Sequence, residues 1–291
     1  AERARLATHA LTSMTNPKMD HEIFFTVSHM TRPPAMDHNA SDLHCHGKFM
    51  EVLPLMRVMS GSLENMHVEK KWMEVLLKMQ GPDGLIYSPT TGRDWILPPN
   101  QDVASGSPGS DTFKEKHFCL LGFSTARSRA VLALYAKKEP GGPWAEAAGR
   151  LASAYGRLMI NEGDRSHLFS TWMYPGREVV PPESHPFNEY GYLAGTQAWI
   201  AQYLAVYDRA LDDPAASQLA ERIMNYNVFE IEYNEPDGRF KPSKGVGAGP
   251  LREKNQYAHF HTHAMNILAC IYVYMQTGNE RLLERAVKAY E

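Results

Sequence analysis

Three clusters of polar and aromatic residues contain most of the side chains in this sequence that could do chemistry. They run from Met36 to Glu51, from Tyr174 to Tyr192 and from Asn255 to His263. Each lies directly before, or at the start of, a stretch with helical apolar spacing. Imidazoles and carboxylates exchange protons and form hydrogen bonds near neutral pH, so these clusters mark the predicted functional site.

The first cluster leads into a predicted helix that begins near Leu43. On that helix, His44, Lys48 and Glu51 fall on one face, because steps of four and three residues nearly complete whole turns. A polar stripe entering an apolar helix needs a partner or a cavity. Asp42, directly before Leu43, has a simpler explanation as the residue that caps the helix.

The histidines allow three interpretations. The alternation of His44 with His46, and the four-residue step from His259 to His263, are compatible with zinc ligands. No Glu follows His259 as it does in helical zinc hydrolases, and Cys45 has no second cysteine nearby. We therefore expect no cofactor and no metal, with zinc as the alternative. The other two interpretations are catalytic or sugar-binding imidazoles in a polar cleft, and structural histidines at helix starts.

The carboxylates suggest glycosidic bond cleavage, which generally needs one protonated carboxyl group and one carboxylate. Glu189 lies between Asn188 and Tyr190, where partial desolvation would raise its pKa. The aromatic residues of the clusters could stack on sugar rings or simply anchor the loops. The residues predicted to be catalytic are Glu189, Asp37, His263, His44 and Glu51. The residues predicted to bind substrate are His46, Trp172, Tyr174, His185, Asn188, Tyr190, Tyr192, Tyr257, His259 and His261.

Helical hairpins must position these clusters. Apolar spacing near 3.6 residues predicts helices at 1–13, 43–60, 64–80, 115–136, 143–160, 190–210, 214–230, 259–276 and 279–291. After the first, they form four pairs, and in three of these the first helix is apolar on most sides and the second has a charged face. First members should form an inner ring and second members an outer ring. A short strand at 23–27 and two Pro-Asp-Gly turns, at Pro82 and Pro236, are predicted in the long joints.

The composition limits the classes of partner. The chain has 291 residues, 43% of them hydrophobic, and a net charge of −3 without charge blocks, so nothing indicates binding to nucleic acid or to an anionic membrane. Three widely separated cysteines suggest no disulfide framework. The apolar runs fall short of the roughly 20 residues that a membrane span needs. We expect a carbohydrate partner, no nucleic acid and no membrane.

Two runs resemble a known group of enzymes. His44-Cys45-His46-Gly47-Lys48-Phe49-Met50-Glu51-Val52-Leu53-Pro54-Leu55-Met56-Arg57, and the stretch from His261-Thr262-His263-Ala264 to Thr277-Gly278-Asn279-Glu280-Arg281-Leu282-Leu283, look like carbohydrate-active enzymes with the six-hairpin toroid. The beta-L-arabinofuranosidase superfamily is the closest in pattern. Its best-known members use a cysteine nucleophile beside a zinc ion held by a Glu and further cysteines, and this chain lacks that cluster.

The resemblance implies an all-α fold, an (α/α) toroid of helical hairpins with short strands in the loops between hairpins. Nine predicted helices make an incomplete (α/α)6 barrel, so we expect one domain over residues 1–291, truncated at both ends. The implied activity is that of a glycoside hydrolase. A uronate-directed polysaccharide lyase, a sugar epimerase and a non-catalytic carbohydrate-binding toroid are the alternatives, and the sequence leaves the sugar, the localisation and the oligomeric state open.

Overall fold

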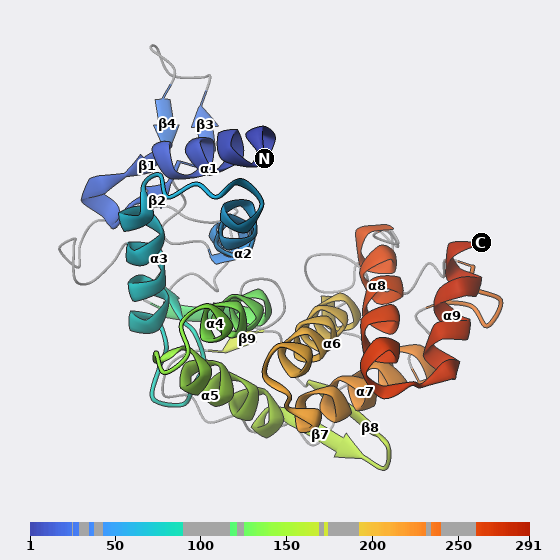
Figure 1. Cartoon of the computed structure of the whole chain (residues 1–291). Coiled ribbons are helices and arrows are strands. Elements are labelled where there is room, and N and C mark those ends of the chain that lie inside the picture. Colours follow the sequence, from blue (N-terminus) through green and yellow to red (C-terminus); the bar gives the residue numbers. More distant parts are fainter. Residues whose placement is uncertain are drawn as a thin grey trace. The chain divides into compact units, whose positions relative to one another are not determined.

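The protein is described by a computed structural model that covers residues 1–24, 26–28, 35–37, 43–89, 117–120, 125–168, 172–173, 192–230, 234–239 and 260–291. Helices dominate these ranges (Figure 1). They are α1 (Glu2–Ser13), α2 (Leu43–Ser60), α3 (Met66–Lys78), α4 (Ala126–Lys138), α5 (Trp144–Arg157), α6 (Tyr192–Leu211), α7 (Pro214–Phe229), α8 (Phe260–Thr277) and α9 (Glu280–Tyr290).

Short strands lie between the helices. The strands are β1 (Thr15–Asn16), β2 (Glu22–Ile23), β3 (Thr26–Ser28), β4 (Ala35–Asp37), β5 (Ser88–Pro89), β6 (His117–Leu120), β7 (Met159–Glu162), β8 (Arg165–Leu168) and β9 (Trp172–Met173), with a 3-10 turn, η1 (Pro17–Met19). Antiparallel pairs join β1 to β2, β3 to β4, β5 to β6 and β7 to β8, for example with Val27 opposite Met36 and Ile160 opposite His167. These strands fit the prediction of strands within the joints.

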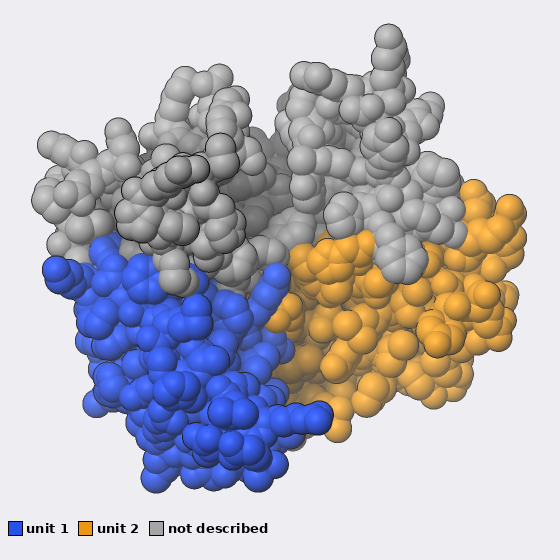
Figure 2. All heavy atoms as spheres, turned by 90° about the horizontal axis from the view of Figure 1, so that it is seen from above, with its two compact units in different colours: residues 1–119, 174–176 blue, residues 120–173, 177–291 orange. Residues whose placement is uncertain are grey.

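The chain divides into two compact units, residues 1–119 with 174–176 and residues 120–173 with 177–291 (Figure 2). In the first unit, α1 buries Ala4, Thr8 and Thr12 and packs on α2. A buried ion pair between Arg57 Nε and a Glu69 carboxylate oxygen joins α2 to α3. Trp72, 1% exposed, is among the largest buried side chains of this unit.

The second unit shows the predicted order of inner and outer helices. Helix α6 packs against α4, α7 and α8, while α5 pairs with α4 and α9 with α8 (Figure 1). The first members of the hairpins, α4, α6 and α8, thus lie next to one another. The second members α5 and α9 bury mainly one face each, against the inner helices, whereas α7 is buried on all sides from Ile223 to Val228.

A chain of buried amides runs through the interior of the second unit. The backbone N–H of Leu168 in β8 donates to Gln197 Oε1 (3.1 Å), Gln197 Nε2 donates to Asn227 Oδ1 (3.1 Å), and Asn227 Nδ2 donates to Asn266 Oδ1 (3.1 Å). The three amide side chains are at most 3% exposed. Each bond satisfies a polar group that would otherwise be costly to bury, so the amides join β8, α6, α7 and α8.

The two Pro-Asp-Gly turns have the same structure. In the first, Gly84 N–H donates to Gly81 O (3.0 Å) and the Gln80 amide donates to Gly84 O (3.0 Å). In the second, Gly238 N–H donates to Glu235 O (2.8 Å) and the Asn234 amide donates to Gly238 O (3.3 Å). Both glycines have positive φ, 89° and 91°. Each turn follows the second helix of a hairpin, as the repeat predicts.

Two predicted boundaries differ from the structure. The helix predicted at 115–136 begins at Ala126, and part of its expected first turns is the strand β6, His117–Leu120. The helix predicted at 143–160 ends at Arg157, before β7. Both errors arise where a short apolar run is compatible with either a helix or a strand, which periodicity cannot separate. The strand predicted at 23–27 is represented by β2 and β3, and Phe25 lies outside the described residues.

Candidate functional site

The structure describes the side chains of four predicted site residues, His46, Glu51, His261 and His263. For four others it gives only the backbone: Asp37 in β4, His44 in α2, Trp172 in β9 and Tyr192 at the start of α6. The remaining predicted residues lie outside the described ranges, and their roles stay predictions: Tyr174, His185, Asn188, Glu189, Tyr190, Tyr257 and His259.

His46 lies in the interior of the first unit. Its side chain is 5% exposed, and its ring meets the ring of Trp72 in α3 edge to face, with 4.6 Å between the centroids. Trp72 Nε1 in turn donates to the His21 carbonyl oxygen (2.6 Å). This setting favours a structural role for His46. Glu51, on the same helix, is half-buried.

His263 is held on both sides of its ring. Asn234 Nδ2 lies 2.9 Å from His263 Nδ1, and the Ala289 carbonyl oxygen lies 3.3 Å from Nε2. An amide nitrogen can only donate, so Nδ1 accepts and Nε2 carries the proton that it donates to Ala289. Burial lowers the pKa of His263 below its ordinary value. The geometry therefore favours a neutral, structural histidine that ties α8 to the end of α9.

A second arrangement lies on one face of α6. Trp199 and Tyr203 are four residues apart, so their side chains are neighbours along the helix. The His261 ring, in the first turn of α8, approaches the Trp199 ring edge to face at 5.4 Å. The Arg127 guanidinium, in the first turn of α4, lies over the Tyr203 ring at 5.3 Å. We call Arg127, Trp199, Tyr203 and His261 the α6-face cluster.

The α6-face cluster joins the starts of α4 and α8 to the middle of α6. Trp199 and Tyr203 are buried, Arg127 is half-buried, and His261 is exposed. The cluster thus holds two nitrogen-bearing side chains, one half-buried and one exposed, against two buried aromatic rings. The N–H groups of arginine and histidine side chains can form hydrogen bonds with a polar ligand.

Sequence reasoning identified only His261 in this cluster. Trp199 lies in mid-helix, as a core residue does, and its side chain is 5% exposed. Arg127 was missed because the predicted helix began at residue 115, which placed Arg127 far from a helix start. The four-residue step from Trp199 to Tyr203 was the available signal.

Arg129, two residues after Arg127, is fully buried in the second unit. Its guanidinium lies over the Tyr155 ring at 4.7 Å, and its three nitrogens have no hydrogen-bond partner. Burial lowers the pKa of Arg129 to about 10, and the nearby Tyr155, Tyr207 and Asp213 oppose that shift. The face of the Tyr155 ring and the Asp213 carboxylate thus partly compensate the charge of the buried Arg129 guanidinium.

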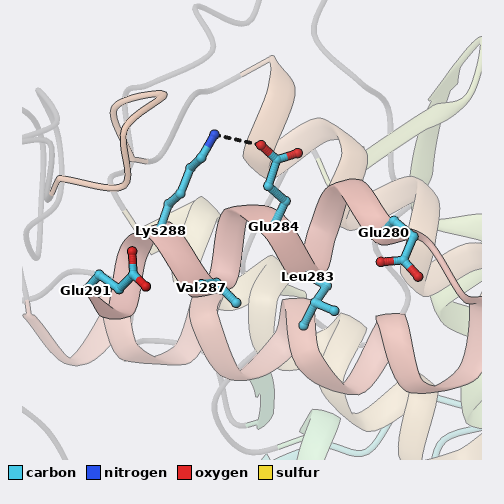
Figure 3. Close-up of a pocket in the computed structure, with 6 residues that line it drawn as sticks. All are labelled: Glu280, Leu283, Glu284, Val287, Lys288 and Glu291. Carbon is cyan, nitrogen blue, oxygen red and sulfur yellow. Dashed lines mark hydrogen bonds and ion pairs between the residues drawn. The ribbon is translucent and has the colours of Figure 1, made fainter.

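A groove of about 450 Å³ lies along α9 (Figure 3). Five of its six lining residues lie on this helix and the sixth, Glu291, directly follows it; Lys288 Nζ pairs with Glu284 one turn away at 2.7 Å. The hydrogen bond from Lys288 lowers the pKa of the exposed Glu284 carboxyl. We assign no chemistry to this groove, because it contains no predicted site residue and belongs to an outer helix.

Within the described residues, no His, Cys, Asp and Glu side chains form a group of three or more that could hold a metal ion. In the same part of the chain, every helix is too short or too polar to cross a membrane. Cys270 is buried, and burial raises the pKa of its thiol to about 12, which keeps it protonated near neutral pH.

Comparison with known proteins found similarity at the level of structure. No family model matches the chain, and no curated protein matches it in sequence. Among solved structures, it is similar to the unsaturated glucuronyl hydrolase from Bacillus sp. GL1, described as responsible for the degradation of glycosaminoglycan. The TM-score is 0.52 at 13% identity, over 99% of this chain and 82% of that chain.

Two further structures give the same result. One is described as UGL with dGlcA-Glc-Rha-Glc, with a TM-score of 0.51, 14% identity and coverage of 99% and 82%. The other is an unsaturated glucuronyl hydrolase specific for heparin, with a TM-score of 0.51, 12% identity and coverage of 99% and 81%. At such identities the similarity shows the fold alone.

The similarity confirms the predicted fold class. The chain has the all-α, α/α-toroid fold of helical hairpins. The comparison with the beta-L-arabinofuranosidase superfamily is not supported, because these structural neighbours are unsaturated glucuronyl hydrolases. The single-domain interpretation stays a prediction.

Proposed function

We propose that this protein is a glycoside hydrolase that acts on oligosaccharides ending in an unsaturated uronyl unit. The observation that carries the proposal is the structural similarity to unsaturated glucuronyl hydrolases along 99% of the chain. The predicted clusters of carboxylates, histidines and aromatics are compatible with it, because each precedes a helix that begins a hairpin.

Glu189 and Asp37 remain the proposed acid and base. One carboxyl group would protonate the leaving oxygen, and the other carboxylate would activate water or attack the sugar. Inversion requires carboxyl groups separated by about 6.5–9.5 Å, and retention about 5–5.5 Å. A crystal structure in which the two carboxyl groups lie far outside both ranges would contradict this pairing.

The decisive experiment uses a disaccharide that a polysaccharide lyase has made from a glycosaminoglycan. Its unsaturated uronyl ring absorbs ultraviolet light, because the ring double bond is conjugated with the carboxylate. Hydrolysis frees the anomeric carbon, the ring opens to an enol, and the enol becomes a ketone. The absorbance should therefore fall when the protein is added, and chromatography should show equimolar release of the second sugar.

The same measurement separates the alternatives. A polysaccharide lyase would leave this disaccharide intact but raise the absorbance of the parent polysaccharide, because elimination creates the double bond. A non-catalytic carbohydrate-binding toroid would change neither absorbance. Either result would contradict the proposed hydrolase.

Replacement of the proposed carboxyl groups tests their roles. Glu189→Gln and Asp37→Asn should each lower kcat by at least about 100-fold, since general acid and base catalysis contributes about 10²–10⁴. Glu146→Gln, at an exposed carboxyl group of α5 outside the predicted clusters, is the control and should keep most of the activity. Equal losses in all three variants would argue against the assigned roles.

A further inference from the structure

Two histidines that are far apart in the sequence lie side by side in the first unit. His21 directly precedes β2, and His67 lies in the first turn of α3. Their ring centroids are 5.2 Å apart, with 74° between the ring planes. His67 is exposed and His21 is half-buried, so solvent reaches the pair. Neither residue belongs to the three clusters that mark the predicted site.

Hydrogen bonds hold the backbone of His21 against α3. Trp72 Nε1 donates to the His21 carbonyl oxygen (2.6 Å), and the Trp72 side chain is 1% exposed. The His21 N–H donates to Asn16 O (2.9 Å) across the turn between β1 and β2. Asp20 and His21 have positive φ, 52° and 59°, which is uncommon for residues other than glycine. The surrounding contacts thus hold an unusual backbone conformation that places His21 beside His67.

The ring nitrogens of the pair suit a metal ion. Thr15 Oγ1 lies 3.0 Å from His21 Nδ1. When this hydroxyl oxygen accepts the Nδ1 proton, Nε2 carries the lone pair that a metal ion needs. Within the described residues, neither His21 Nε2 nor the His67 ring takes part in a hydrogen bond. An outer hydrogen bond such as that to Thr15 orients the imidazole in most histidine metal sites.

The distance between the two rings fits a shared ion. Two imidazoles on one tetrahedral zinc ion, with Zn–N bonds of about 2.0–2.1 Å, have ring centroids about 5 Å apart. The observed 5.2 Å between His21 and His67 agrees with this value. Because the His67 side chain is exposed, it can turn to direct a ring nitrogen at the ion.

The charges around the pair are compatible with a cation. Burial, the neighbouring His67 and Lys71 lower the pKa of His21, whereas Asp20 opposes this shift. A lowered pKa favours the neutral imidazole, which is the form that binds a metal ion. Lys71 Nζ pairs with Glu74 at 2.8 Å, so the positive charge nearest to the pair is partly neutralised.

We propose that His21 and His67 form a two-histidine site for a divalent transition metal ion such as Zn²⁺. Imidazole ligands favour zinc, nickel and copper, whereas magnesium and calcium need oxygen ligands. The site has two protein ligands, fewer than the groups of three considered above, and water completes the coordination. The bound ion joins the turn between β1 and β2 to α3 and thereby stabilises the first unit. The site is independent of the proposed hydrolase activity.

Calorimetric titration of the tag-free protein with ZnCl₂, and separately with NiCl₂, tests the site. Other histidines of the chain can also bind these metals, so the informative quantity is the difference between proteins. His21→Gln and His67→Gln should each weaken one binding event by at least about 10-fold, because loss of even an outer-shell partner costs about 10- to 100-fold. His9→Gln, at an exposed histidine of α1 outside the pair, is the matched control and should bind as the wild type does.

Two further variants test the surroundings of the pair. Thr15→Val removes the outer hydrogen bond and should weaken the same binding event about 10-fold. Lys71→Gln removes a positive charge and should strengthen it about two- to threefold. Saturating Zn²⁺ should raise the Tm of the wild type by several degrees and that of His67→Gln clearly less. Circular dichroism without metal verifies that each variant folds, and the exposed His67 is the position least able to disturb folding.

Equal titration curves for the wild type, His21→Gln and His67→Gln would overturn the inference and leave the ring contact as packing alone. A loss in His9→Gln as large as the loss in His67→Gln would also overturn it, because binding would then not depend on the pair. These measurements use no sugar, so a failed hydrolase assay leaves their outcome unchanged.

Discussion

His263 illustrates how one residue can fit a catalytic pattern and a structural one. In sequence it lies four residues after His259 in a polar cluster, which suggested chemistry. In the structure both ring nitrogens bond to protein groups, Asn234 on one side and Ala289 on the other. A general base needs a nitrogen that can reach a substrate proton, so the observed bonds suit the structural alternative.

The buried His263 should make stability depend on pH. Burial lowers its pKa in the folded protein, so below about pH 6.5 the unfolded chain binds a proton that the folded one resists. The contribution of neutral His263 to the free energy of unfolding is therefore fully present above about pH 6.5. It is lost as the pH falls towards the lower pKa of the folded protein. We expect the wild type to lose more stability than His263→Gln between about pH 7.5 and pH 5.5.

Urea unfolding at the two pH values measures this difference. The pKa values of His21 and His167 are also lowered by burial, so the informative quantity is the change in the wild type minus the change in the variant. An equal loss in both proteins would show that His263 does not titrate in this range.

At the scale of elements, the second Pro-Asp-Gly turn carries a packing constraint. A Cβ atom on Gly238 would lie 1.8 Å from the Lys288 carbonyl oxygen in α9, and φ is 91°. Gly141, at the turn between α4 and α5, has φ of 88° and nothing within 4 Å of such an atom. Both glycines have a positive φ, and they differ in whether an added Cβ atom would meet a neighbouring backbone atom.

Alanine at the two glycines should therefore have different effects. Gly141→Ala should cost about 1–2 kcal/mol for the positive φ alone. Gly238→Ala should cost about 1–3 kcal/mol more, because the turn or α9 must move. Urea unfolding gives the free energies, and hydrogen exchange should show lost protection in α9 only for Gly238→Ala. Similar values for both variants would contradict the tight contact.

The hydrogen-bonded chain of buried amides should also contribute to the stability of the second unit. Asn227→Ala leaves the Gln197 amide and the Asn266 oxygen without their bonds to Asn227, at about 1–3 kcal/mol for each group. Gln218→Ala removes an exposed amide of the same helix and should stay within about 0.5 kcal/mol. Unfolding midpoints compare them, and similar midpoints for the two variants would show that the amide chain contributes little.

Helix positions were largely predictable, because apolar spacing persists over whole helices and the turns carry Gly, Pro or Asp. Helices α2, α6 and α7 begin and end within two residues of prediction. The start of α4 was not predictable, since the apolar run 117–120 fits a strand as well as a helix. The predicted start at residue 115 differs from the observed start at Ala126 by 11 residues, and for this reason Arg127 was not recognised as a residue near a helix start.

At the scale of the molecule, the sequence predicted the class of fold better than the site. The alternation of apolar and charged helices has a physical reason, the burial of one helix layer by another, and it can be read along the chain. Contacts such as Arg127 with Tyr203 join residues 76 positions apart, and no local pattern encodes them. Burial of His46 likewise depends on Trp72 in another helix.

Ligand binding should stabilise the whole protein if the proposed substrate is right. A ligand that binds only the folded state at about 100 times its Kd adds about 2.7 kcal/mol, which corresponds to a rise of several degrees in Tm. We expect this rise with the unsaturated uronyl disaccharide when turnover is blocked by Glu189→Gln. A neutral disaccharide of the same size should give a clearly smaller rise, because it lacks the carboxylate of the proposed substrate. Differential scanning calorimetry compares the two, and equal shifts would show that the protein does not distinguish the charge of the sugar.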